Sequence, residues 1–167
     1  MGTGKSTIGR LIAGRLGFRF LDTDALVVES AGTEIPEIFR KEGEEGFRQR
    51  ESAVLESLQG TARCVVATGG GIVLREQNRA LLRNLGLVVL LTASEDAIFE
   101  RVSRNSRRPL LETTDPRATV QEMLTARAPL YALAAEWALD NTELSHGQAA
   151  DAVIEQARQR FSWQVAP

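Results

Sequence analysis

Short apolar runs alternate along the chain with longer segments in which apolar residues recur every three or four positions. The short runs predict four strands, Phe18–Leu21, Cys64–Ala67, Leu87–Leu91 and Trp137–Leu139. The longer segments predict six helices, Lys5–Leu16, Gly43–Gln59, Arg75–Asn84, Glu95–Arg104, Pro116–Ala128 and Gly147–Phe161. Because the strands alternate with helices, the pattern predicts an α/β fold built around a parallel sheet.

The composition narrows the class of protein. The chain has 167 residues with no internal repeat and no Pro/Gly/Ser-rich linker, so we expect one domain over residues 1–167. It carries 20 Lys and Arg against 22 Asp and Glu, which argues against a nucleic-acid partner. The longest apolar run, Leu87–Leu91, is too short to cross a bilayer, so we expect no membrane partner. The single cysteine, Cys64, cannot form an internal disulfide, which favours a cytoplasmic location.

A glycine-rich segment leads into the first predicted helix and reads Gly2-Thr3-Gly4-Lys5-Ser6-Thr7. Glycines let consecutive backbone N–H groups curve around phosphate oxygens, a lysine reaches the β- and γ-phosphates, and the next hydroxyl binds Mg²⁺. The full phosphate-loop pattern has a further glycine five positions before Gly4, so the sequence holds only its second half. A glycine-rich helix start, or a myristoylation signal formed by Gly2 and Ser6, explains the same letters. We favour the nucleotide-binding interpretation.

Two aspartates, Asp22 and Asp24, follow the first predicted strand. Ligands of an open parallel sheet gather beyond the carboxyl ends of its strands, and alternate residues of an extended segment share a face. One carboxylate could therefore help to hold Mg²⁺, while the other accepts a proton or hydrogen bonds from a hydroxylated substrate. Taken alone, the pair is explained slightly better by a helix N-cap and a turn aspartate.

Three glycines and three arginines are the remaining candidates for a functional site. The glycines, Gly69–Gly71, directly follow a predicted strand and its Thr68, which indicates a tight turn or a backbone that a ligand must approach closely. Arg48, Arg108 and Arg127 carry the side chain best suited to a bidentate grip on carboxylate or phosphate. Most arginines in a protein are solvated surface residues, and this explanation holds for each of the three when it is considered singly.

Together these features resemble the shikimate kinase family over essentially the whole chain. The matching motifs are Gly4-Lys5-Ser6-Thr7, Leu21-Asp22-Thr23-Asp24, Gly43-Glu44-x-x-Phe47-Arg48-x-x-Glu51, Gly69-Gly70-Gly71, Arg108-Pro109-Leu110-Leu111 and Arg127-Ala128-Pro129-Leu130-Tyr131. The resemblance implies a three-layer α/β/α P-loop kinase fold. It also implies an enzyme of chorismate and aromatic amino-acid biosynthesis that transfers the γ-phosphate of ATP, with Mg²⁺, to the 3-hydroxyl of shikimate.

The resemblance implies roles for individual residues on the substrate side. Asp24 would bind the hydroxyls of shikimate and act as the base. Arg48 and Arg127 would hold the shikimate carboxylate, and the backbone of Gly69–Gly71 would close round the ring.

On the nucleotide side, Lys5 would contact the ATP phosphates. The other residues expected to line the nucleotide in this loop are Gly2, Thr3, Gly4, Ser6 and Thr7. Ser6 and Asp22 would hold Mg²⁺, Arg108 would reach the transferred phosphate, and Arg101 would pack on the adenine. The segment Asn141–Ser145 matches the family poorly and receives no role.

The resemblance also sets expectations for the organisation of the chain. Residues 24–51 would form the substrate-binding segment and residues 105–115 a lid. Independently of the resemblance, Asp115 directly before Pro116 predicts an N-cap followed by proline at the first helical position. Family members have a strand and the leading glycine of the phosphate loop before the position of Met1. We therefore expect the first strand of the sheet to be missing, through a misplaced start, a fragment, or a domain cut from a longer chain. We expect a monomer.

Two other functions compete with shikimate phosphorylation. One is a ligand-sensing domain cut from a helix-turn-helix regulator, which could afford to lose Asp24 or Arg108. This chain retains both residues. The other is a related kinase for a substrate such as gluconate, which would not explain two arginines and a triple glycine in this arrangement.

Overall fold

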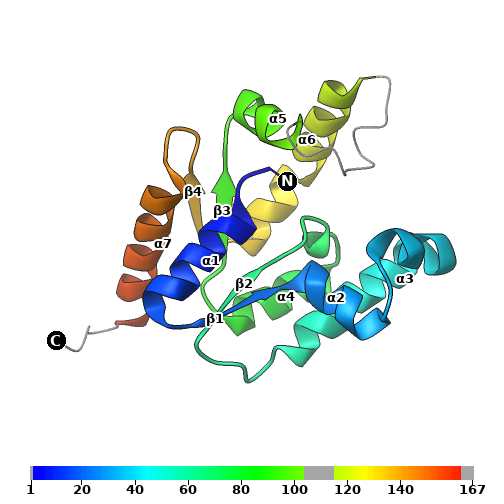
Figure 1. The fold of residues 1–167 in the computed structure, drawn as a ribbon, viewed down its shortest axis with the longest axis horizontal. Coiled ribbons are helices and arrows are strands. Elements are labelled where there is room, and N and C mark those ends of the chain that lie inside the picture. The colour runs from blue at the N-terminus through cyan, green and yellow to red at the C-terminus, as the bar shows by residue number, and fades with distance from the viewer. Residues whose placement is uncertain (1, 104–114, 163–167) are drawn as a thin grey trace.

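The computed structural model describes residues 2–103 and 115–162 (Figure 1). Its elements are, in order, α1 (Lys5–Leu16), β1 (Arg19–Asp22), α2 (Thr23–Ala31), α3 (Ile35–Ser57), β2 (Cys64–Ala67), the 3₁₀ turn η1 (Ile72–Leu74), α4 (Glu76–Leu85), β3 (Val89–Thr92), α5 (Glu95–Ser103), α6 (Pro116–Ala134), β4 (Trp137–Asp140) and α7 (His146–Phe161). Arg108 and the expected lid, apart from Asp115, lie outside the described residues, and so does the side chain of Arg101.

The strands form two parallel pairs. β1 pairs with β2, with Asp22 opposite Ala67, and β3 pairs with β4, with Thr92 opposite Asp140. In the described part of the chain these pairs are separate two-stranded sheets. The predicted α/β class with parallel strands is thus confirmed.

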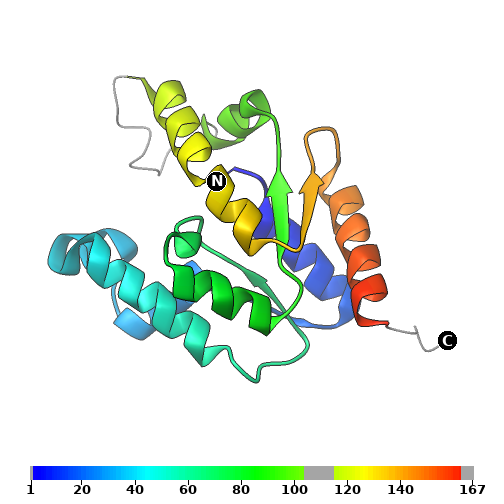
Figure 2. The same ribbon diagram turned by 180° about the vertical axis from the view of Figure 1, so that it is seen from behind.

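Helices cover the strands from both sides, which gives the three layers. Figure 1 shows α1 in front of the strands, and Figure 2 shows α4 and α6 in front of them from behind. On the first side, Ile8 and Ile12 of α1 pack with Leu91 of β3 and with Val153 and Ile154 of α7.

A second apolar cluster holds the opposite layer together. Leu55 of α3, Ile72 and Val73 of η1 and Ala134 of α6 are buried together, with Leu82 of α4 beside them. The helices α2 and α3 form a lobe with a small core of its own, which contains Val27, Ile38, Phe47 and Val54. No helix in the described ranges is long and apolar enough to span a membrane.

The predicted elements agree with the structure except around α2, α3 and α6. Helix α2 was not predicted. Helix α3 begins before the predicted Gly43 and is interrupted there, because Gly43 has a φ of 71° that a helix cannot accommodate. Helix α6 continues through Pro129 to Ala134, beyond the predicted end. At its start, the Asp115 carboxylate accepts a hydrogen bond from the backbone N–H of Ala118 at 3.0 Å, so the predicted N-cap is confirmed.

Candidate functional site

The glycine-rich loop lies at the N-terminus of α1. Gly2 and Gly4 have φ values of 73° and 82°, in the left-handed region, and α1 begins at Lys5. Buried Asn141, which follows β4, donates from Nδ2 to the carbonyl oxygen of Thr3 at 2.7 Å. No sequence pattern indicated this contact. The loop is therefore held to the end of β4, with the positive end of the α1 dipole behind it, a suitable arrangement for an anion.

The two aspartates occupy different positions at the end of β1. The Ser6 hydroxyl donates to Asp22 Oδ2 at 2.9 Å, while Asp22 Oδ1 accepts from the backbone N–H of Asp24 at 3.1 Å. Asp22 is thus the N-cap of α2, as one interpretation of the sequence held, and it also contacts the loop. The structure therefore brings together the two residues predicted to hold Mg²⁺.

The oxygen atoms of Ser6 and Asp22 fit Mg²⁺ as a partial ligand set. Mg²⁺ prefers hard oxygen ligands, and it usually combines one or two protein carboxylates with phosphate oxygens and water. Among the described residues, no group of three or more His, Cys, Asp or Glu could hold a metal by itself. A magnesium ion bound by Ser6 and Asp22 would take its remaining ligands from water and from the phosphate oxygens of a nucleotide.

The triple glycine lies against side chains rather than in a strained turn. Gly69, Gly70 and Gly71 have no positive φ, so their conformation does not require glycine. Space does require it: a Cβ on Gly69 would lie 2.5 Å from Asp24 Oδ1 and 3.0 Å from Glu51 Oε1. A Cβ on Gly71 would lie within 3.0 Å of the guanidinium of Arg48. The glycines thus let three charged side chains approach one backbone segment.

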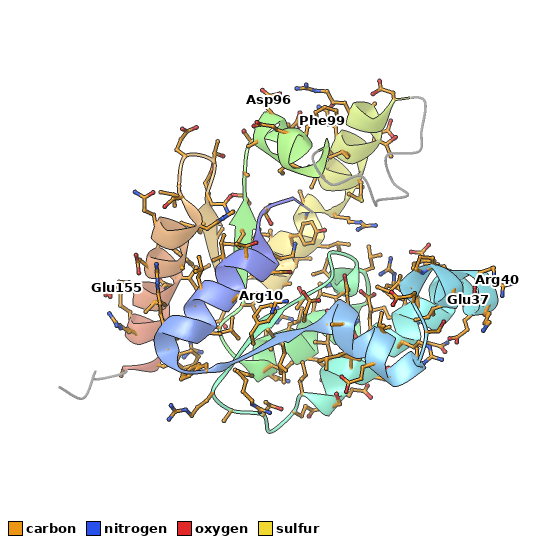
Figure 3. All side chains as sticks on the ribbon, in the orientation of Figure 1. Arg10, Glu37, Arg40, Asp96, Phe99 and Glu155 are labelled. Atoms are coloured by element: carbon orange, nitrogen blue, oxygen red, sulfur yellow. The ribbon has the colours of Figure 1, made fainter. Side chains whose placement is uncertain are left out.

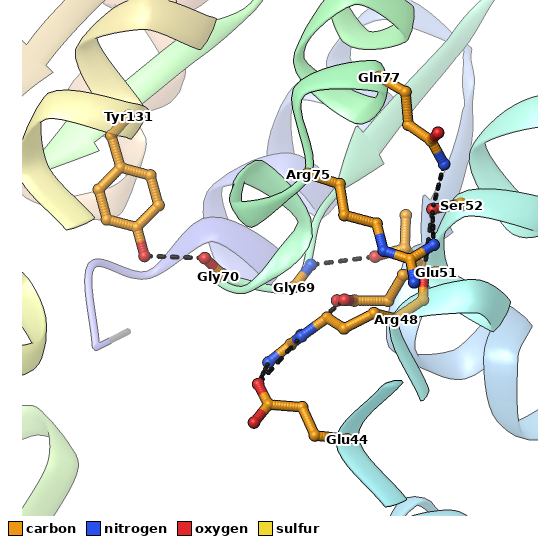
Figure 4. Close-up of polar contacts among 10 residues, drawn as sticks. Glu44, Arg48, Glu51, Ser52, Gly69, Gly70, Arg75, Gln77 and Tyr131 are labelled. Carbon is orange, nitrogen blue, oxygen red and sulfur yellow. Dashed lines mark hydrogen bonds and ion pairs between the residues drawn. The ribbon is translucent and has the colours of Figure 1, made fainter. Parts of the chain in front are cut away.

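Arg48 is the centre of a charged cluster on this segment (Figure 4). Its Nη1 donates to Glu51 Oε2 at 2.6 Å, and its Nη2 donates to Glu44 Oε1 at 3.0 Å. The side chains of Arg48 and Glu51 are 12% and 1% exposed, whereas that of Glu44 is 65% exposed. The buried carboxylate therefore orients the guanidinium, and the exposed carboxylate occupies the side of it that faces solvent.

The environment of Glu51 shows how closely the charges gather. Burial raises the pKa of the Glu51 carboxyl, the ion pair with Arg48 opposes this, Asp24 raises it further and Arg127 lowers it. The pKa of Glu51 is therefore affected by Asp24, Arg48 and Arg127, the three charged residues that the resemblance assigns to the substrate side. The sequence motif contained Glu51, but nothing in the motif indicated that this side chain would be buried.

Helix α6 is held to the triple glycine by Tyr131. Its hydroxyl donates to the carbonyl oxygen of Gly70 at 2.9 Å (Figure 4). Arg127 lies one turn earlier on α6, half-buried. The Tyr131 contact thus holds α6 beside the triple glycine, and Arg127 interacts electrostatically with Glu51 of the cluster.

A second buried contact explains why Gly69 is so close to β1. The backbone N–H of Gly69 donates to the Thr23 hydroxyl oxygen at 3.0 Å, and Thr23 is fully buried. The ends of β1 and β2 are thereby joined beyond their ladder. Thr23 stands between the two predicted aspartates, and its structural role was missed in the sequence.

Other strongly paired charged side chains lie on the protein surface, outside the site. Arg40 and Lys41 lower the pKa of Glu37 to about 2. In Figure 3, Glu37 and Arg40 lie at the outer end of α3, away from the strand ends.

Arg75 contacts Glu45 and donates to Ser52 Oγ at 3.4 Å, and Gln77 donates to the same oxygen at 3.3 Å (Figure 4). These contacts hold α4 to α3 beside the site.

Comparisons with known proteins agree on one family. The family model described as shikimate kinase matches residues 1–158. A shikimate kinase of Marinomonas sp. is 42% identical over 167 residues, covering 99% of this chain and 92% of that protein. One of Thioalkalivibrio sulfidiphilus is 51% identical over 140 residues, covering 84% and 74%.

Solved structures agree as well. Shikimate kinase from Acinetobacter baumannii in complex with shikimate superposes with a TM-score of 0.88 at 36% identity, covering 99% of this chain and 91% of that one. Shikimate kinase from Aquifex aeolicus gives a TM-score of 0.81 at 28% identity, covering 96% and 94%.

Proposed function

The chain belongs to the shikimate kinase family, and from this membership and its site we propose that it transfers the γ-phosphate of ATP to the 3-hydroxyl of shikimate. The observation that carries the proposal is the gathering of Asp24, Arg48, Glu51 and the triple glycine at the strand ends, next to the glycine-rich loop. The products would be shikimate 3-phosphate and ADP.

On the substrate side, a carboxylate and hydroxyls would find complementary groups. Arg48 and Arg127 would bind the carboxylate of shikimate, because guanidinium groups match a carboxylate in charge and geometry. Asp24, which lies against Gly69, would accept hydrogen bonds from the substrate hydroxyls and take the proton of the attacking one. The backbone of Gly69, Gly70 and Gly71 would line the ring.

On the nucleotide side, the loop of Gly2, Thr3 and Gly4, with Thr7, would surround the phosphates, and Lys5 would contact them. Phosphoryl transfer depends mostly on positioning the two reactants and on neutralising the charge of the phosphates, so at least one cation must lie beside them. Ser6 and Asp22 would hold Mg²⁺, which screens the phosphate charge when bound. Arg108 would act on the transferred phosphate and Arg101 on the adenine, as the resemblance implies.

The test is release of ADP from MgATP with shikimate, with gluconate and with no acceptor. We expect release only with shikimate. Tight shikimate binding without any release would instead support a sensing domain, and faster release with gluconate would assign the chain to another kinase. We also expect a monomer with one domain, and light scattering on the same preparation tests the oligomeric state. Truncation at residues 24 and 51 tests whether the segment between them binds the substrate.

A further inference from the structure

Helix α3 is broken at Gly43 into two helical halves, residues 35–42 and residues 44–57. Gly43 has a φ of 71° and a ψ of −175°, a backbone conformation that essentially only glycine adopts. A Cβ at this position would meet nothing within 4 Å, so the glycine is not needed for space. Because glycine loses more conformational freedom on folding than any other residue, contacts between the two halves must hold the turn.

A salt bridge joins the two halves. Arg50 donates from Nε to Glu42 Oε2 at 2.8 Å and from Nη2 to Glu42 Oε1 at 2.7 Å. The two residues are eight positions apart, which is about 12 Å along the axis of a straight helix, whereas side chains that meet on a helix are three or four positions apart. The salt bridge therefore depends on the turn at Gly43. Its hydrogen bonds lower the pKa of the Glu42 carboxyl.

Gly46 gives the Glu42 side chain the room that this salt bridge needs. A Cβ on Gly46 would overlap the Cβ of Glu42 and would lie 3.2 Å from Glu42 Oε2. The Glu42 side chain therefore lies directly against the backbone of Gly46. Glycine inside a helix lowers the stability of the helix relative to alanine. Both glycines of this part of α3 thus serve one salt bridge, since Gly43 makes the turn and Gly46 admits the carboxylate.

An aromatic contact continues from the first half of α3 to Arg48. The ring centroids of Phe39 and Phe47 are 4.7 Å apart, and the rings are tilted by 30°. Phe47 is buried, and the guanidinium carbon of Arg48 lies over its ring, 5.3 Å from the centroid. Phe39 belongs to the first half and Phe47 to the second, so this contact depends on the same turn. The first half of α3 thus supports, through Phe47, the guanidinium that would bind the substrate carboxylate.

We propose that the salt bridge between Glu42 and Arg50 holds α3 in its turned form and thereby positions Arg48 for the carboxylate of the acceptor substrate. Glu42 and Arg50 are positioning residues, because they act on Arg48 through the turn and the aromatic contact. Without the salt bridge, the two halves of α3 move independently and Arg48 loses one of its supports. The role of Arg48 in this inference rests on the proposed function.

The test removes each side of the salt bridge while keeping a side chain of similar length. The variants are Arg50→Gln, Glu42→Gln and the double substitution. Arg40→Gln is the matched control, because Arg40 donates to Glu37 with the same two nitrogens, at 2.8 and 2.6 Å, but within the first half of α3 (Figure 3). Calorimetry gives the Kd for shikimate, and ADP release gives kcat and the KM for ATP. Amide exchange over residues 44–48 is measured without any substrate.

Each single substitution at the salt bridge should weaken shikimate binding roughly two- to fivefold, the range expected for one partly exposed ion pair. Amide exchange over residues 44–48 should become faster by a similar factor, because these amides open when the turn is released. The double variant should bind no more weakly than either single variant, since both changes remove the same interaction. We expect kcat and the KM for ATP to change by less than about twofold, and Arg40→Gln to match the parent in every value.

Two results would overturn the proposal. A lower Tm of Arg50→Gln with the parent Kd for shikimate would show that the salt bridge only stabilises the fold. Effects that multiply in the double variant would show that Glu42 and Arg50 act separately. Absence of ADP release from the parent with shikimate would refute the proposed function instead, while the binding and exchange measurements still decide whether the salt bridge positions Arg48.

Discussion

Gly71→Ala tests the explanation of the triple glycine most directly. Gly71 is buried with a φ of −85°, which alanine adopts freely, so the change introduces no backbone strain. The new methyl group would overlap the guanidinium of Arg48, the far end of a flexible side chain. Arg48 must therefore leave its position, while the fold is retained.

The magnitude follows from what Arg48 would lose. A hydrogen bond to a charged group contributes about 1.5–3 kcal/mol, so removing the Arg48 grip on a carboxylate should raise the KM for shikimate roughly ten- to a hundredfold. The KM for ATP should change by less than about twofold, because the glycine-rich loop is not touched. The assay is coupled ADP release, with each substrate varied in turn.

Two alanine variants provide the controls. A Cβ on Gly14, in the last turn of α1, would meet nothing within 4 Å, so Gly14→Ala should leave kinetics unchanged and stabilise the fold by up to about 0.5–1 kcal/mol. Gly70→Ala would place a Cβ 3.2 Å from the Tyr131 hydroxyl, so its effect should lie between the two. If Gly71→Ala keeps the parent KM for shikimate, the glycine is not there to make room for Arg48.

Three further substitutions divide the site by function. Asp24→Asn should lower kcat about 10²–10⁴-fold with nucleotide binding, measured by titration, close to the parent, and a kcat above half the parent value would remove Asp24 from the mechanism. Arg127→Lys should raise the KM for shikimate more than that for ATP, because lysine loses the two-pronged geometry; equal increases in steady-state assays would contradict this. Glu44→Gln should lower the KM for shikimate roughly two- to fivefold, because it frees the exposed side of Arg48 from a competing carboxylate, and an increase would show that Glu44 helps binding.

Local pattern predicted most of the elements because their signals are contained in short stretches. Helix α1 was predicted over Lys5–Leu16 and β2 over Cys64–Ala67, with the bounds that the structure has. Helix α2 was missed because it has only nine residues, too few to show a long helical period of its own. Its apolar face, with buried Val27, packs on α3. The end of α6 was missed because Pro129 usually terminates a helix, whereas here α6 continues through it.

The sequence by itself determined the α/β class, the glycine-rich loop and the residue types of the site, since these depend on periodicity and on side-chain chemistry. Only the tertiary structure decided that Glu51 is buried and paired with Arg48, and that Asn141 holds Thr3. Asn141 and Thr3 are 138 positions apart, so no local pattern relates them. The pairing of β1 with β2 and of β3 with β4 was likewise decided by the tertiary structure, because strand order depends on which edges meet and each edge carries the same backbone groups.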